Sequence, residues 1–454
     1  MLAASKNLKK KRTLFEHCFE MTSILTYFSE RFLLLMFMTA HLTKKSIFPV
    51  LLLLTVGCNR HEKQENNEQS STPMEYSKGT FGYDLEFLKR YHQDLVLLHD
   101  SVEGAQLIVL PGYQGRVMTS TARGLAGNSF GWINYDLIAS QAPAKHIHAF
   151  GGEERFWLGP EGGQFSIYFK KGDPFTFEHW QVPAEIDTEP FVVAGATADE
   201  VQLTKEMHLE NYFGTKLNLM VNRNIRLLSR KGVEELLDIV VPNNIETVGF
   251  QSENIITNTG TERWTKKTGM LSVWILSMLN ASNETTVAIP FRDGDEKLLG
   301  KIVTDDYFGK VPADRLAIGD HVILFKADGK YRSKIGLSPK RALPIVGSFD
   351  ALNEVLTIAT FSLPEGATDY VNSLWELQND PFRGDAINSY NDGPVNGGQM
   401  GNLYEIESSS PAAALAPGEH LTHYHRTIHL KGPKESLNII SQKVLGVGVD
   451  EIRL

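Results

Sequence analysis

The pattern of hydrophobic residues along the chain predicts one helix followed by many strands. Between residues 81 and 100, leucines and a tyrosine recur at spacings of three and four, which is the period of an amphipathic helix. Beyond Gln106 the pattern changes to short apolar or alternating runs that end at Gly, Pro, Asn or Asp. Residues 231–239 give only one further short helical pattern, and strands do not alternate with long helices. We therefore predict an all-β fold, a single large antiparallel sandwich with a few short helices.

The first 57 residues predict an export signal that lies outside this domain. Lys44 and Lys45 precede an apolar run over residues 47–54, which is too short to cross a membrane as a helix. The Gly57-Cys58 ending that follows resembles the lipobox of bacterial lipoproteins, in which the cysteine is acylated. A start at Met38 would leave a signal of about 20 residues, a normal length, so we expect the true start there.

The residues after Cys58 predict a tether between an anchor and the domain. Residues 59–73 are almost entirely polar and offer nothing to bury. We thus expect a signal region over residues 1–57, a lipid anchor and tether over 58–80, and the β domain over 81–454. The expected location is the bacterial cell envelope, with lipid attachment at Cys58 on the periplasmic or outer-membrane side. A plain secreted protein is the alternative.

Composition excludes one class of partner. Lys and Arg number 45 against 54 Asp and Glu, for a net charge of −9, and the domain has no basic stripe. Nucleic-acid binding normally requires a basic surplus, so we expect none. Only 2 cysteines occur, and Cys18 would precede the true start, so an exported domain would fold without a disulfide.

Candidate chemistry first appears in a glycine-rich segment, residues 146–163. Two Gly pairs enclose Glu153, Arg155, Trp157 and Glu161. An aromatic ring beside carboxylates and a guanidinium suits a sugar, because the ring stacks on the C–H face while the polar groups bind hydroxyls. The alternative is a structural corner in which these charges pair with one another.

The second candidate is the predicted strand over residues 403–407. Strand alternation places Tyr404 and Ile406 on one face, and Glu405 and Glu407 on the other, with the two carboxylates about 7 Å apart along the strand. These carboxylates either serve a ligand or form a solvated face. Trp274 would stack on a ligand or belong to the core, and the polar segment just upstream adds two candidate substrate-binding residues, Asn391 and Asp392.

The histidines raise the question of a metal. His146 and His148, like His423 and His425, are spaced to share a strand face, and imidazoles with a carboxylate can bind zinc. Periodicity does not bring the two pairs together, so we expect no metal and keep these four as the candidates. Motifs for nucleotide binding, a serine-hydrolase elbow and a zinc protease are also absent, and no cofactor is expected.

These segments together resemble uncharacterised bacterial proteins of the galactose mutarotase-like group, which includes the aldose 1-epimerases. The resemblance rests on residues 150–161, on Glu405 to Ser408 and on residues 415–419. It implies a β-supersandwich fold from about Gln106 onward, Glu407 as the catalytic base and Arg155 as a sugar contact. The motif that carries the epimerases' acid histidine is not found, and His148 or His179 would have to replace it.

Three functions therefore remain open from the sequence. The first is an exported lipoprotein that binds, and epimerises or otherwise processes, a carbohydrate on a concave sheet, with Glu407, Glu161 and His148 as the catalytic candidates. The second is a polysaccharide hydrolase or lyase that uses Glu161 and Glu407 as a carboxylate pair. The third is a non-catalytic glycan-binding or structural envelope lipoprotein.

Overall fold

The N-terminal helix is shorter than the leucine pattern suggests. In the computed structural model, which describes residues 75–100 and 102–454, helix α2 (Phe81–Tyr91) begins at the Thr80 cap and ends at His92. The rest of the predicted helix forms strand β1 (Val96–His99), which pairs with residues 106–109. Leu95 and Leu98 fit the helical period by coincidence, and cross-strand pairing decides their conformation. The prediction of one helix over residues 81–100 was wrong in its second half.

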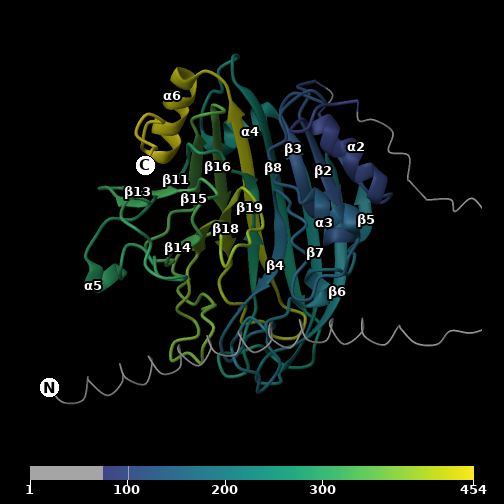
Figure 1. The fold of residues 1–454 in the computed structure, drawn as a ribbon. Coiled ribbons are helices and arrows are strands. Elements are labelled where there is room, and N and C mark those ends of the chain that lie inside the picture. Colours follow the sequence, from purple (N-terminus) through teal and green to yellow (C-terminus); the bar gives the residue numbers. More distant parts are fainter. Residues whose placement is uncertain (1–74, 101) are drawn as a thin grey trace, which may run out of the picture. The chain divides into compact units, whose positions relative to one another are not determined.

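The first sheet is small and lies under α2. It has the order β1–β2 (Gln106–Leu110)–β3 (Arg116–Thr121). Phe81 and Leu88 of α2 pack with Ile108 and Met118 of this sheet. The 3-10 helix η1 (Pro111–Tyr113) joins β2 to β3, and α3 (Tyr135–Ser140) follows further along the chain. In Figure 1, α2 and α3 lie on the side of the fold formed by β2 and β3.

The second sheet has ten antiparallel strands and forms one layer of a sandwich. Its order is β12 (Leu316–Ile318), β13 (Val322–Lys326), β11 (Thr285–Pro290), β15 (Ile345–Asp350), β16 (Val355–Phe361), β19 (His420–Lys431), β8 (Glu246–Asn258), β7 (Lys216–Leu228), β6 (Glu200–Glu210) and β5 (Val192–Ala196).

The third sheet has six antiparallel strands and forms the other layer. Its order is β14 (Ser333–Leu337), β17 (Ile387–Asn391), β18 (Leu403–Ser409), β9 (Ser272–Leu276) and β4 (Arg155–Gly159), with β10 (Leu279–Asn280) pairing to the start of β18.

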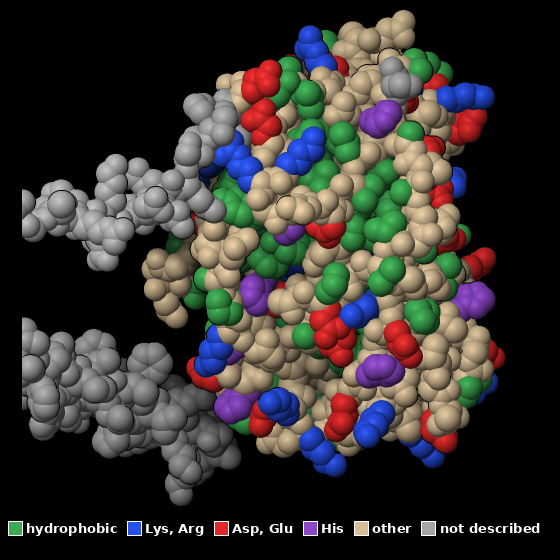
Figure 2. Space-filling view, turned by 90° about the vertical axis from the view of Figure 1, so that its right-hand side faces the viewer, with side chains coloured by type: hydrophobic (Ala, Val, Ile, Leu, Met, Phe, Trp, Pro, Cys, Tyr) green, Lys and Arg blue, Asp and Glu red, His purple; other side chains and the backbone are tan. Residues whose placement is uncertain are grey.

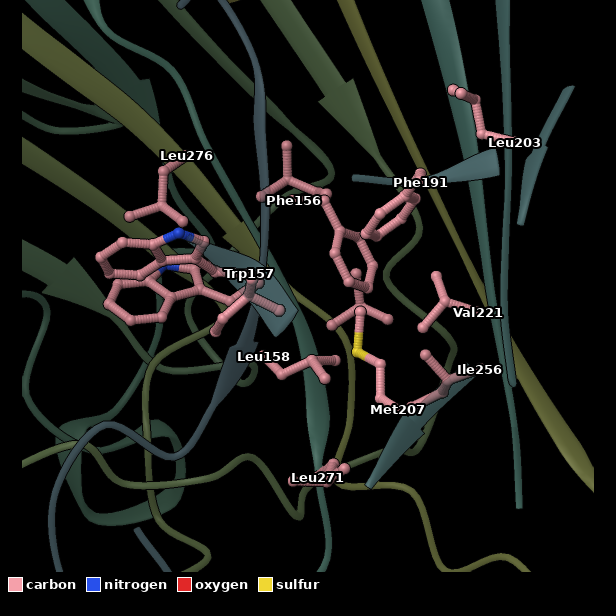
Figure 3. Close-up of a cluster of buried hydrophobic side chains, with 14 of the residues drawn as sticks. Phe156, Trp157, Leu158, Phe191, Leu203, Met207, Val221, Ile256, Leu271 and Leu276 are labelled. Atoms are coloured by element: carbon pink, nitrogen blue, oxygen red, sulfur yellow. The ribbon is translucent and has the colours of Figure 1, made fainter. Parts of the chain in front are cut away.

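The hydrophobic core fills the space between these two layers. Phe156 and Leu158 of β4 belong to the same cluster as Met207, Val221 and Ile256 of the ten-stranded sheet. Figure 3 shows Phe156 and Leu158 on the side of β4 that faces those residues, and Trp157 and Leu276 on the opposite side. The alternation along β4 thus turns one face of the six-stranded sheet away from the ten-stranded sheet, although Trp157, Trp274 and Leu276 on that face are also buried and belong to the same hydrophobic cluster. We call this the outer face.

Helices cover the far side of the ten-stranded sheet. Helix α4 (Arg230–Leu237), at the position of the predicted short helix, and α6 (Lys434–Leu445) bury Val233, Leu437 and Ile440 against strands of that sheet. The remaining short helices are η2 (Ala184–Ile186) and α5 (Glu296–Leu299). The all-β antiparallel sandwich with a few short helices is confirmed.

Two further observations concern the surface and the N-terminus. On the side formed by α2, α3 and β5, hydrophobic side chains gather in patches between polar ones (Figure 2). No helix within residues 75–100 and 102–454 is long and apolar enough to cross a membrane. The predicted signal, Met38 start and Cys58 lipobox lie outside the described residues.

Candidate functional site

Strand pairing collects the candidate residues on the outer face. In the register of β4, β9 and β18, Trp157 lies opposite Trp274, while Leu276 lies opposite both Arg155 and Glu407. Side chains at these paired positions project to the same face of a sheet. On β18 the division is the one that alternation predicts. The Tyr404 hydroxyl lies 2.7 Å from that of Ser348 in the ten-stranded sheet. Glu405 and Glu407 instead pair with Arg155 and Lys334 of the six-stranded sheet.

A buried ion pair lies near the middle of this face. Arg155 Nη2 donates to Glu405 Oε1 at 2.6 Å, and the two side chains are only 3% and 7% exposed. The guanidinium also lies over the Trp157 ring, 5.0 Å from its centre, as in a cation–π contact. Burial raises the pKa of Glu405 to about 7 although Arg155 opposes the shift, and Glu407 raises it further. Arg155 is therefore the main charge that keeps Glu405 ionisable near neutral pH.

Glu407 is held by a lysine and a tryptophan. Its Oε2 accepts hydrogen bonds from Lys334 Nζ at 2.8 Å and from Trp274 Nε1 at 2.9 Å. The Lys334 ammonium in turn lies 5.0 Å from the centre of the Trp274 ring and 5.6 Å from that of Tyr307. The carboxylate is thus fixed by one oxygen, and its position is determined by three strands.

The third carboxylate, Glu161, follows β4 and is partly exposed. Burial raises its pKa to about 7, and its next largest influences are the charges of Lys334 and Glu407. Glu161 therefore belongs to the same charge cluster as Glu407 and Lys334, and it changes protonation near neutral pH.

Several polar atoms on this face have no partner in the protein. Among the described residues, Glu407 Oε1, Arg155 Nε and Trp157 Nε1 are buried without a hydrogen bond. Buried polar groups are nearly always paired, so an unpaired group marks a place for water, an ion or a ligand. Three such atoms near one another indicate a face built to receive polar groups.

A pocket of about 300 Å³ opens on the outer face. Its lining includes Trp274, Lys334, Tyr307, Asp385 and Asn388. This volume is at the lower end of the usual range for ligand sites. The pocket thus combines an aromatic ring, a cation, a carboxylate and an amide beside the Glu407 carboxylate.

Four of the predicted residues lie elsewhere. Glu153 is fully buried between the sheets, where Oε1 accepts from Ser120 and contacts His429 Nε2 at 2.7 Å. Asn391 also points inward, since its amide binds the backbone of Gly329 and Tyr331.

The other two have their polar atoms occupied. Asp392 accepts from Tyr390 and from the Gly401 amide. His148 contacts Asp187 with Nδ1 at 2.7 Å and accepts from the Ala144 amide with Nε2. The structure does not bring His148 to the pocket, so its proposed place as the acid has no geometric support.

The candidate metal ligands are not grouped. Within the part of the chain that the structure describes, no three His, Cys, Asp or Glu side chains are placed to hold a metal ion. His423 and His425 share the Ser408 hydroxyl, each at 2.9 Å, in the core. His146 contacts the Trp180 carbonyl with Nδ1.

Sequence reasoning missed the pocket's own polar residues. Lys334, Tyr307, Asp385 and Asn388 come from three separate segments and have no distinctive local spacing. Of the predicted residues, Trp274 lines the pocket, and Glu407 is bonded to two residues that do. Alternation along residues 387–391 would have placed Asn388 on the same face as Glu407, its register partner.

A second, larger pocket lies at the other end of β18. It measures about 570 Å³, and Asp84, Trp132, Asn280 and His429 are among its lining residues. None of the candidate site residues named from the sequence lines it.

Solved structures similar to the chain include galactose mutarotase-like proteins. The Slr1438 protein from Synechocystis is 13% identical with a TM-score of 0.44, over 74% of this chain and 95% of that one. A putative aldose 1-epimerase from Escherichia coli is 11% identical with a TM-score of 0.42, over 75% and 100%. A galactose mutarotase-like protein from Lactobacillus casei is 9% identical with a TM-score of 0.43, over 74% and 99%. Likeness at this level carries no information about substrate or reaction.

No curated protein matches the chain in sequence. One family model does, over residues 79–454, which span the β domain and helix α2. The chain therefore belongs to DUF6786, a family of unknown function.

Proposed function

We propose that the outer-face pocket binds a carbohydrate. The observation that carries this proposal is a pocket lined by Trp274 and Lys334, both of which donate to the Glu407 carboxylate, whose other oxygen is buried and unpaired. The charges of Lys334 and Glu407 also act on Glu161. An indole offers a face for the C–H side of a sugar ring, and charged groups bind hydroxyls through strong hydrogen bonds.

The same cluster supports proton transfer to a bound sugar. Epimerisation at the anomeric carbon needs an acid and a base placed about the ring oxygen and the anomeric hydroxyl. Glu161, whose pKa is raised to about 7, can either hold or accept a proton at neutral pH. Glu407, fixed by Lys334 and Trp274, supplies the second carboxylate. In this proposal Glu161 takes the part of the acid, for which His148 and His179 were the replacements considered from the resemblance.

Calorimetric titration of the full purified chain tests the binding. The panel is D-glucose, D-galactose, D-mannose and D-glucuronate, each titrated into the wild type and into Lys334→Met. We expect saturable binding of at least one sugar, weakened at least tenfold in the variant, because charge-assisted hydrogen bonds contribute about 1.5–3 kcal/mol. The exposed Lys231→Met on α4 is the matched control and should bind as the wild type does.

Absence of binding across the panel and across oligosaccharides would contradict the proposal. Where a sugar binds, NMR saturation transfer between its anomers tests epimerisation, with Glu161→Gln and Glu407→Gln as inactive variants. Release of reducing sugar from a polysaccharide would instead favour a hydrolase that uses the same two carboxylates.

We also propose that the protein is exported and lipid-anchored at Cys58. The support is the basic, apolar and Gly57-Cys58 order of the sequence, followed by a polar tether. Cells that express the wild type should incorporate labelled palmitate into this protein, and Cys58→Ser should abolish the incorporation. Equal labelling of both would contradict the anchor.

A further inference from the structure

A second polar cluster lies in the same pocket and has no part in the carboxylate chemistry. Tyr307 Oη donates to Asp385 Oδ2 at 2.5 Å and accepts from Asn388 Nδ2 at 3.0 Å. All three residues line the pocket, together with Lys334 and Trp274. We call Tyr307, Asp385 and Asn388 the tyrosine cluster.

The backbone beneath this cluster is shaped to accommodate it. Gly336 lies on β14 opposite Asn388, and its φ is not in the left-handed region, so backbone conformation does not require glycine there. Space does. A Cβ at residue 336 would lie 2.2 Å from Asp385 Oδ2 and 2.5 Å from Asn388 Nδ2. Any side chain at this position would displace the two groups that hold Tyr307.

The two hydrogen bonds leave the Tyr307 hydroxyl with one free acceptor site. A tyrosine hydroxyl has one donor and two acceptor sites. Asp385 takes the donor and Asn388 fills one acceptor site, so one lone pair remains. The Lys334 ammonium, which donates to Glu407, lies 5.6 Å from the centre of the Tyr307 ring. Tyr307 is therefore close to the group that holds Glu407.

We infer that Tyr307 binds a ligand hydroxyl directly and that Asp385 and Asn388 are positioning residues which fix its orientation. This inference rests on the proposed function and adds a recognition element to it. The ligand class is a sugar with a free hydroxyl that donates to Tyr307 while the rest of the ring lies toward Trp274 and Glu407. A sugar that lacks that hydroxyl, or carries it as an ether, would lose the contact.

The raised pKa of Asp385 fits this arrangement. Burial raises it, and the charges of Lys301 and Lys334, with hydrogen bonds from Tyr307 and Thr304, oppose the shift. Burial disfavours the ionised form of this carboxyl, and the hydrogen bond that Tyr307 donates favours it. The Asp385 carboxylate therefore depends on the hydrogen bond from Tyr307, and this bond fixes the orientation of the Tyr307 hydroxyl.

Titration of monodeoxy sugars against the full chain tests the inference. D-Glucose, D-galactose and their monodeoxy analogues are titrated into the wild type, Tyr307→Phe, Asp385→Asn and the double variant. We expect about a tenfold weaker Kd for Tyr307→Phe, the loss of one hydrogen bond at the upper end of its usual range. One monodeoxy analogue should bind the wild type about tenfold more weakly than its parent sugar does. The same analogue and its parent sugar should bind Tyr307→Phe with equal Kd values. The double variant should be no weaker than Tyr307→Phe, because Asp385 acts through Tyr307.

Controls separate this result from a loss of structure. Tyr331→Phe, outside the pocket lining, should leave the Kd unchanged, and all variants are compared by thermal unfolding. Gly336→Ala should weaken binding as Tyr307→Phe does. Gly195→Ala on β5, where a Cβ meets no atom closer than 3.5 Å, should not.

Two results would overturn the inference in distinguishable ways. If the wild type binds a sugar but Tyr307→Phe binds it equally well, or if every monodeoxy loss persists in Tyr307→Phe, the role of Tyr307 is wrong and the proposed function stands. If the wild type binds no sugar, the proposed function fails and the inference fails with it.

Discussion

Replacing Arg155 with methionine removes the positive charge that is paired with Glu405 on the outer face and should lower the free energy of unfolding. Arg155 and Glu405 are almost fully buried and joined at 2.6 Å, so the variant leaves a buried carboxylate with no counter-charge. Breaking one partner of a buried pair costs about 3–5 kcal/mol of unfolding free energy. We expect this cost at pH 8, where Glu405 is mostly ionised in the wild type because its pKa there is about 7.

The cost should depend strongly on pH, and the sign follows from linkage. The pKa of Glu405 is raised in the folded state, so the folded protein binds this proton more tightly than the unfolded chain does. The contribution of protonated Glu405 to the free energy of unfolding is fully present below pH 4.5, the pKa in the unfolded chain, and is lost as the pH rises through about 7. At pH 5 Glu405 is protonated in the folded variant, and only packing and a hydrogen bond, about 1–2 kcal/mol, should be lost.

Urea unfolding of the full chain at pH 5 and pH 8 measures both values. Arg383→Met is the matched control, because its 3.8 Å partner Asp380 is exposed and such pairs contribute about 0–1 kcal/mol. The double variant Arg155→Met with Glu405→Gln should recover most of the loss at pH 8. A penalty for Arg155→Met that is equal at the two pH values, or no larger than that of Arg383→Met, would show that Arg155 does not stabilise an ionised, buried Glu405.

Three further predictions concern other buried groups. Burial lowers the pKa of His423 and His425 to about 3, so folding should lose about 1.4 kcal/mol per histidine for each pH unit below 6.5. Urea unfolding of His425→Gln should show a shallower decline over that range, and an unchanged slope would count against buried neutral histidines. Glu161→Gln should leave the stability at pH 8 equal or higher, because the wild type carries a carboxyl whose pKa burial raises to about 7, and a large loss in urea unfolding would contradict this. Phe156→Ala should cost about 3–5 kcal/mol in the same assay, since the ring is 1% exposed within the core, while the 57%-exposed Phe177→Ala should cost under 1 kcal/mol.

The layered architecture could be predicted from the sequence because alternation is a local property. Tyr404 and Ile406 lie in the hydrophobic core, and Glu405 and Glu407 pair with residues on the outer face, as the strand pattern requires. The prediction from the glycine-rich segment was wrong for Glu153, which would share a face with Arg155 and Trp157 only in a straight strand. The chain bends at Glu153, before β4 begins at Arg155, and the side chain turns between the sheets to meet His429.

The centre of the site could not be predicted, because its contacts join distant segments. Lys334 and Glu407 are 73 residues apart, and neither has a neighbour that signals the pair. The tyrosine cluster joins Tyr307, which lies outside the named strands, to Asp385 and Asn388. These contacts depend on the pairing of β14 with β17. Such contacts depend on strand order, which a single sequence with no repeated period does not reveal.

The most direct test of the central claim is a crystal structure of the protein soaked in the sugar that binds most tightly. We expect density for a sugar ring beside Trp274, within hydrogen-bonding distance of Lys334, Glu407 or Tyr307. Density only in the larger pocket lined by Trp132 and His429, or on no built site at all, would contradict it.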